Sequence, residues 1–183
     1  MKKYLTMISC FIILAIAFGC TTVYKAAVDE RNVRTIASDK KIAATILKEF
    51  YDDKTVKVLD ISPACYSGHV YLVGEYETKK QRKRAVEIAR KKKGVKTVTT
   101  YLLPKKKDDH CGTSDNLAIT AKVKTRLIKD KEIWSTNVNV KTVQCNVVLL
   151  GIVGSKGEIR KAITHAKSVE GVRSVKSFLK SVK

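Results

Sequence analysis

The side chains with the widest chemical range in this sequence of 183 residues are five cysteines and three histidines. A thiol can carry lipid, ligate a metal, form a disulfide or attack a substrate, and its neighbours decide which. His110 precedes Cys111, but no Cys-X-X-Cys or His-X-X-X-His spacing accompanies them, so we expect no metal site. The sequence also has no nucleophile motif, no paired catalytic carboxylates and no phosphate-binding glycine loop. We therefore expect neither enzymatic activity nor a cofactor.

Cys20 follows a segment typical of exported proteins. A lysine-containing start precedes an apolar run, Met7–Phe18, which is shorter than the roughly 20 residues that span a bilayer. The run leads into Ala17-Phe18-Gly19-Cys20, which resembles the bacterial lipobox except that Phe18 is larger than usual. The resemblance implies a signal peptide over residues 1–19 and lipidation of the Cys20 thiol. An ordinary signal peptide and an uncleaved anchor are the alternatives.

The sequence is strongly basic, which indicates a polyanionic partner. It has 37 Lys and Arg residues against 17 Asp and Glu residues, a formal net charge of +20. Because an exported protein does not meet the chromosome, we expect no nucleic acid partner and favour an anionic membrane or wall polymer. Thr21 stands where aspartate would resemble an inner-membrane retention signal. This favours the periplasmic face of an outer membrane, or the cell membrane of a host with one membrane.

The body of the chain is one module used twice. A shift of 77 positions aligns His69–Gly74 with Asn146–Gly151, and Gly94 with Gly171. Apolar positions with helical spacing match as well: Ile42 with Ile119, Ile46 with Val123, and Phe50 with Leu127. Matches across both helix-like and strand-like segments indicate a duplication.

Each copy has the predicted order α-β-β-α-β. The spacing of Ile42, Ile46 and Phe50 is typical of an amphipathic helix, which Ser38 and Asp39 can cap. In the first copy we predict a helix over Ser38–Asp53, strands over Val56–Ile61 and Val70–Val73 joined by a loop at Ser62–Gly68, a helix over Thr78–Lys92 and a strand over Val95–Leu103. In the second copy we predict a helix over Asp115–Asp130, strands over Thr136–Lys141 and Asn146–Ile152, a helix over Ser155–Ser168 and a strand over Val172–Leu179.

These elements predict an α+β fold in which each copy packs two helices on one face of a small mixed sheet. After the signal peptide, residues 20–37 form a tether with a short edge strand at Asn32–Ile36. Residues 38–103 form the first copy, 104–114 the linker and 115–183 the second copy. Each copy is small for a core of its own, which favours docking of the two copies.

Three cysteines remain beyond Cys20 for the oxidising compartment. Cys65 and Cys145 fall in or beside predicted hairpin loops, and Cys111 lies in the predicted linker. We predict a disulfide between Cys65 and Cys111, with Cys111 and Cys145 as the alternative pair. Either bridge would fasten the linker to one copy, and the third thiol would be free for an intermolecular bridge.

The repeated module resembles the BON domain. The resemblance is carried by Gly68-His69-Val70-Tyr71-Leu72-Val73-Gly74 with Gly94-Val95, and by Val147-Val148-Leu149-Leu150-Gly151 with Gly171-Val172. Cys145 stands where the first hairpin glycine of the second copy would be. A lipobox, then Asp29-Glu30-Arg31, then two copies is similar to the dual BON-domain envelope lipoproteins of the DolP/OsmY type. The resemblance implies a non-enzymatic protein that binds anionic phospholipid and supports envelope integrity under stress.

The resemblance also implies that the lipid contact is the first helix of the second copy, Asp115–Lys131. Its apolar positions face inward and basic residues occupy its other faces, where each Lys or Arg near an anionic surface contributes about 1 kcal/mol. Trp134 follows, either at the headgroup level or packed in the core. The predicted lipid-binding residues are Leu117, Lys122, Lys124, Arg126, Lys129, Lys131 and Trp134.

A second basic cluster lies on the second predicted helix of the first copy. Its residues are Lys79, Lys80, Arg82, Lys83 and Arg84, followed by Arg90-Lys91-Lys92-Lys93. It is either a second anionic contact or a solvated face. Two other functions stay open. One is an adaptor that holds an envelope protein or wall polymer while lipid only localises it, and the other is a tethered structural stress protein without a specific ligand.

Overall fold

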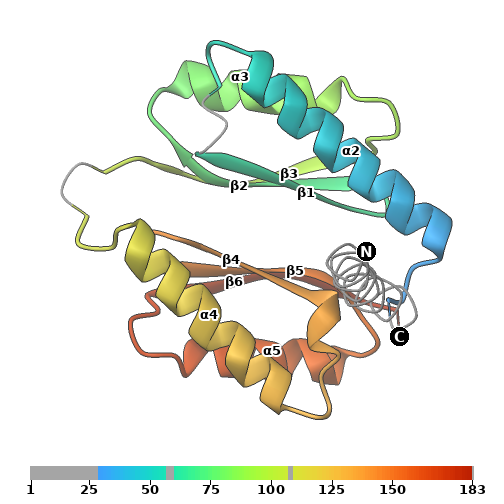
Figure 1. Ribbon diagram of the computed structural model, residues 1–183, viewed down its shortest axis with the longest axis vertical. Coiled ribbons are helices and arrows are strands. Elements are labelled where there is room, and N and C mark those ends of the chain that lie inside the picture. The colour runs from blue at the N-terminus through green and yellow to red at the C-terminus, as the bar shows by residue number, and fades with distance from the viewer. Residues whose placement is uncertain (1–28, 57–59, 107–108, 183) are drawn as a thin grey trace, which may run out of the picture.

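Two three-stranded sheets face each other at the centre of the molecule, and helices cover their outer sides (Figure 1). The computed structural model describes residues 29–182 apart from 57–59 and 107–108, so the predicted signal peptide, Cys20 and the tether up to residue 28 lie outside the described residues. Copy one consists of α2 (Val33–Asp52), β1 (Ile61–Tyr66), β2 (His69–Tyr76), α3 (Lys79–Arg90) and β3 (Thr97–Pro104). Copy two consists of α4 (Thr113–Lys129), the short 3-10 helix η1 (Ser135–Asn137), β4 (Val138–Val143), β5 (Asn146–Val153), α5 (Lys156–Lys167) and β6 (Ser174–Ser181).

Both copies have the predicted α+β fold of two helices on a small mixed sheet. In each sheet the middle strand, β2 or β5, pairs antiparallel with the strand before it and parallel with the strand after it. A parallel pair needs a long crossover connection, which α3 and α5 supply. The register repeats with the sequence, since Val70 pairs with Val98 and Val147 pairs with Val175.

Helix α2 begins earlier than the sequence predicted. The edge strand predicted over Asn32–Ile36 is wrong, because Asn32 is the N-cap of α2 and its side chain accepts a hydrogen bond from the N–H of Thr35 at 2.8 Å. Ser38 and Asp39 lie inside the helix and do not cap it. Asn32, Ser38 and Asp39 are all of residue types that cap helices, and Asn32, the first of the three along the chain, is the cap of α2.

The first hairpin also differs from the prediction. The residues predicted as a loop, Ser62–Gly68, form most of strand β1, and the turn is reduced to Ser67 and Gly68 with φ of 52° and 81°. Two successive positive φ angles are typical of a tight two-residue hairpin. Pro63 is tolerated because β1 is an edge strand, where a missing N–H breaks no ladder.

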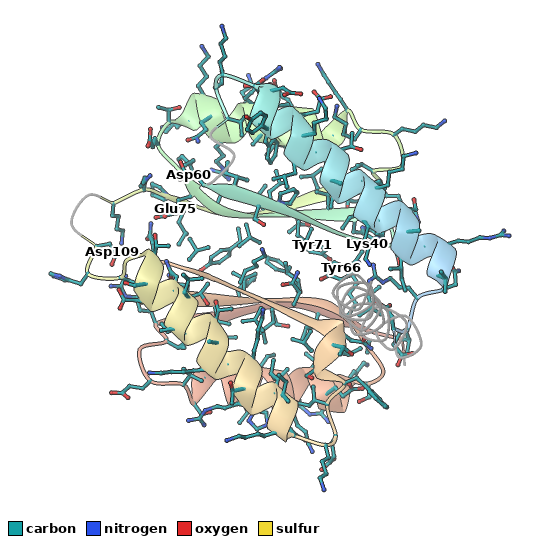
Figure 2. The ribbon with its side chains drawn as sticks, in the orientation of Figure 1. Lys40, Asp60, Tyr66, Tyr71, Glu75 and Asp109 are labelled. Atoms are coloured by element: carbon teal, nitrogen blue, oxygen red, sulfur yellow. A yellow bond between two sulfur atoms is a disulfide. The ribbon has the colours of Figure 1, made fainter. Side chains whose placement is uncertain are left out.

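Three hydrophobic clusters hold the molecule together, one between helices and sheet in each copy and a third between the sheets. In the third, Tyr71 packs on Phe178 with ring centroids 5.4 Å apart, and Figure 2 shows Tyr66 and Tyr71 in this space. Across it, Lys141 Nζ donates to Ser62 Oγ at 3.0 Å. The copies therefore dock through their sheets. All buried members of the clusters lie within residues 42–179, so a chain that starts at residue 21 keeps the whole core.

Candidate membrane-binding surface

Helix α4 lies in the outer layer of copy two, beside α5. The chain enters it through Gly112, whose N–H donates to Asp115 Oδ2 at 2.8 Å and so satisfies one free amide of the first turn. Ile119, Val123 and Leu127 are buried against the sheet, as the sequence predicted. Because these three positions define the inward side, the opposite side of α4 faces solvent.

An apolar ridge follows the outward side of α4. Leu117 and Ile128 are 67% and 69% exposed, and Ala121 between them is exposed too. Their spacing places them on one side of the helix, and we call these three residues the α4 ridge. Leu117 and Ile128 belong to no hydrophobic cluster of the described residues. Large apolar side chains gathered in the open mark a contact with another apolar medium.

The predicted cations flank the α4 ridge. Lys122 and Lys129 lie along one side of it and Lys124 along the other, Arg126 lies further round the helix toward α5, and all four are exposed. Arg126 donates to Ser168 Oγ at 2.8 Å, but no described carboxylate forms an ion pair with any of the four. An apolar stripe between cations is the arrangement of a helix that lies in a membrane interface, with cations at the headgroups and the stripe below them.

Lys131 and Trp134 lie in the turn that follows α4. Lys131 is exposed, and Trp134 is 49% exposed, so its indole is not part of the core. The N–H of Trp134 donates to Glu158 Oε2 at 3.3 Å, which fixes the turn to the start of α5. A half-exposed indole beside a lysine is suited to the headgroup level. All seven predicted lipid-binding residues thus lie on α4 and the turn that follows it.

The equivalent helix of copy one carries different charges. Where α4 has Lys122, Arg126 and Lys129, the positions 77 residues earlier on α2 hold Thr45, Glu49 and Asp52. Both acids form ion pairs inside copy one, each at 2.6 Å. The two helices occupy equivalent places in the fold, so the basic face of α4 comes from its side chains alone.

The second basic cluster lies on α3, in the outer layer of copy one (Figure 1). Arg84 Nε pairs with Asp53 Oδ2 at 2.7 Å, and Arg82 stands over the ring of Tyr76. The members that are exposed and have no side-chain partner among the described residues are Lys79, Lys80, Lys83, Arg90, Lys91 and Lys93. The cluster therefore lies on the outer helix of copy one, and α4 lies in copy two.

The disulfide predicted between Cys65 and Cys111 is wrong. Cys111 is bonded to Cys145, and Cys65 is a free buried thiol. The bridge joins the linker to the β4–β5 turn, where Cys145 has a φ of 57° in place of the glycine of copy one. Asp109 of the same linker accepts a hydrogen bond from Arg173 Nη1 at 2.9 Å, which lowers the pKa of Asp109 to about 2. The start of α4 is thus fixed to copy two at two points.

Sequence reasoning missed a buried polar group at the corresponding corner of copy one. The carboxylate of Asp39 accepts hydrogen bonds from the N–H groups of Gly68 at 2.9 Å and Ser67 at 2.7 Å, and from Arg31 Nη1 at 2.6 Å. Burial opposes ionisation, but these hydrogen bonds outweigh it and lower the pKa of Asp39. Burial and the Asp39 carboxylate raise the pKa of Cys65 to about 12, so this thiol stays protonated. The Asp39 carboxylate thus fastens α2 to the β1–β2 hairpin turn.

Two searches cover the described part of the chain, residues 29–56, 60–106 and 109–182. Within it, no group of three or more His, Cys, Asp or Glu side chains is arranged to hold a metal ion. No helix within the same ranges combines the length and apolar character needed to cross a membrane.

A family model for the BON domain matches residues 38–103 and 115–182. The chain belongs to the BON-domain family. Over 81% of this BON-domain chain, osmotically-inducible protein Y of Escherichia coli K12 is 32% identical, with 75% of that relative covered. The outer membrane lipoprotein DolP of Haemophilus influenzae is 24% identical over 89% of the chain and 84% of its own length.

Solved structures offer a weaker likeness to this BON-domain chain. CdsD, a structural protein of the type III secretion system of Chlamydia trachomatis, matches with a TM-score of 0.33 and 15% identity over 79% of the chain. The chain spans 63% of the CdsD chain. Similarity at this level bears on neither fold nor function.

Proposed function

We propose that this chain is an envelope lipoprotein that binds anionic phospholipid through α4 and the turn after it, and so supports envelope integrity under osmotic stress. The observation that carries the proposal is the exposed α4 ridge between cations without carboxylate partners. The names of the relatives support a place at the periplasmic face of an outer membrane. Acyl chains on Cys20 would anchor the chain there. The proposed activity is binding, without catalysis.

Two physical effects act together at this surface. Each Lys or Arg near an anionic bilayer contributes about 1 kcal/mol, and salt screens this attraction beyond about 8 Å at 0.15 M. Burial of Leu117 and Ile128 in the acyl boundary adds a contribution that salt does not weaken. We therefore expect binding to require anionic headgroups, and a part of it to persist at high salt.

The test is co-sedimentation of residues 21–183 with vesicles of phosphatidylglycerol or of phosphatidylcholine. K122Q/R126Q/K129Q should lose about 3 kcal/mol, which is more than a hundredfold in affinity for the anionic vesicles. L117S/I128S should lose the binding that persists at high salt.

The matched control removes the same charge from the other copy. K40Q/K41Q/K54Q neutralises three exposed lysines of copy one and should bind anionic vesicles as the unmodified chain does. If K122Q/R126Q/K129Q and K40Q/K41Q/K54Q lost equal affinity for anionic vesicles, net charge and not the α4 surface would drive binding. Binding to neither vesicle would leave the adaptor function, which retention of an envelope protein on the immobilised chain would reveal.

A further inference from the structure

The second basic cluster, which we now call the α3 cluster, is a broad cationic surface. The proposed lipid contact through α4 does not use it. Two of its cations are neutralised: Arg84 by Asp53, and Lys92 by Glu49 at 2.6 Å. Those without an ion pair among the described residues are Lys79, Lys80, Arg82, Lys83, Arg90, Lys91 and Lys93. They lie on α3 and the turn after it, so their charges add over one continuous outer surface.

Part of this charge is specific to copy one, although the positions equivalent to Lys79, Lys83 and Arg90 are basic in copy two as well. The position equivalent to Lys80 on α5 holds Gly157, and the position equivalent to Arg82 holds Ile159. After the helix, three consecutive lysines of copy one correspond to Ser168, Val169 and Glu170. Since the two copies share one fold, the fold does not require these cations. They therefore need another explanation.

The α3 cluster and the α4 ridge lie in opposite outer layers (Figure 1). The sheets face inward and are fastened to each other by the Tyr71–Phe178 contact and the Lys141–Ser62 hydrogen bond. One planar bilayer therefore cannot contact both surfaces at once. A chain bound to a bilayer through α4 therefore turns the α3 cluster away from that bilayer.

We infer that the α3 cluster binds a second anionic phospholipid surface, so that one chain bridges two membranes. This rests on the proposed binding through α4. Phosphate headgroups fit the cluster better than a glycan does, because its one aromatic ring, Tyr76, is covered by Arg82 and offers sugars no face to stack on. None of the exposed large apolar side chains of the described residues lies on α3 or the turn after it. The contact is thus purely electrostatic and more sensitive to salt than that of α4.

The test measures binding and bridging separately, with residues 21–183 and phosphatidylglycerol vesicles. Co-sedimentation reports binding, and light scattering reports clustering of the vesicles. K79Q/K83Q/R90Q should keep the vesicle binding that persists at high salt, which we assign to Leu117 and Ile128, but need about a hundredfold more protein to cluster vesicles, since each neutralised cation costs about fivefold. The matched control K156Q/R160Q/K167Q changes the three equivalent positions of copy two and should still cluster vesicles once bound. In about 1 M salt, where screening reaches about 3 Å, clustering should disappear before binding does.

The outcomes separate the bridge from the function on which it rests. Binding without clustering by the unmodified chain overturns the bridge and leaves binding through α4 intact. Clustering that survives in K79Q/K83Q/R90Q also overturns it, and assigns the clustering to self-association of bound chains. Failure of the unmodified chain to bind any vesicle overturns both proposals.

Discussion

Removal of the Cys111–Cys145 bridge should destabilise copy two by about 4 kcal/mol. The two cysteines are 34 positions apart, and in the chain-entropy description a loop of that length confers roughly this stability by restricting the unfolded chain. C111S should therefore lose about 4 kcal/mol. C111S/C145G should recover about 1 kcal/mol of this loss, because glycine removes the cost of a side chain at a φ of 57°. Gly68 already occupies the equivalent place in copy one.

The assay is urea unfolding followed by tryptophan fluorescence. Trp134 is the single tryptophan of the chain and lies in copy two, so its signal reports the copy that contains the bridge. Reductant should lower the stability of the unmodified chain to that of C111S and leave C111S unchanged. A reduced unmodified chain that loses less than about 1 kcal/mol would refute the reasoning, since it would mean that other contacts already hold the start of α4 in the unfolded ensemble.

Three further changes test the fold. Y71A removes a buried ring between the sheets and should cost about 3 kcal/mol, with separate urea transitions for the two copies. G74A would place a Cβ 1.9 Å from the carbonyl oxygen of Asp60, so we expect little folded protein by circular dichroism. Because hydrogen bonds lower the pKa of Asp39 below its unfolded value, its stabilisation is complete above that value and disappears as pH falls through the folded pKa. D39N should therefore show a smaller acid-induced fall of the urea midpoint than the unmodified chain, and an equal fall would contradict this role.

Periodic apolar patterns allowed much of the fold to be predicted. The spacing of Ile119, Val123 and Leu127 predicted the inward side of α4, and the structure buries all three. The repeat predicted that each element of copy one has a counterpart in copy two, and the sheet registers confirm it. Such patterns are local, because a helix or strand must place its apolar residues on one side whatever it packs against.

The prediction failed where local sequence and tertiary context disagree. Ser62 and Pro63 are typical of a turn, yet they belong to β1, because pairing with β2 satisfies the backbone and an edge strand tolerates proline. Ile128 was missed although the sequence contains the signal. It lies eleven positions after Leu117, which is close to three helical turns and hence on the same side of the helix.

The amino-acid sequence by itself determined the repeat, the secondary-structure order and the charge of each helix, since these depend on residue types and their spacing. Only the tertiary structure decided which cysteines pair, because bonding depends on which thiols meet in space and Cys65 is enclosed beside Asp39. The apolar run Val70–Val73 is buried on both sides, but the run does not specify what covers its second side. Docking of the two sheets covers the second side of this run. The same docking places the two basic surfaces in the outer layers of different copies.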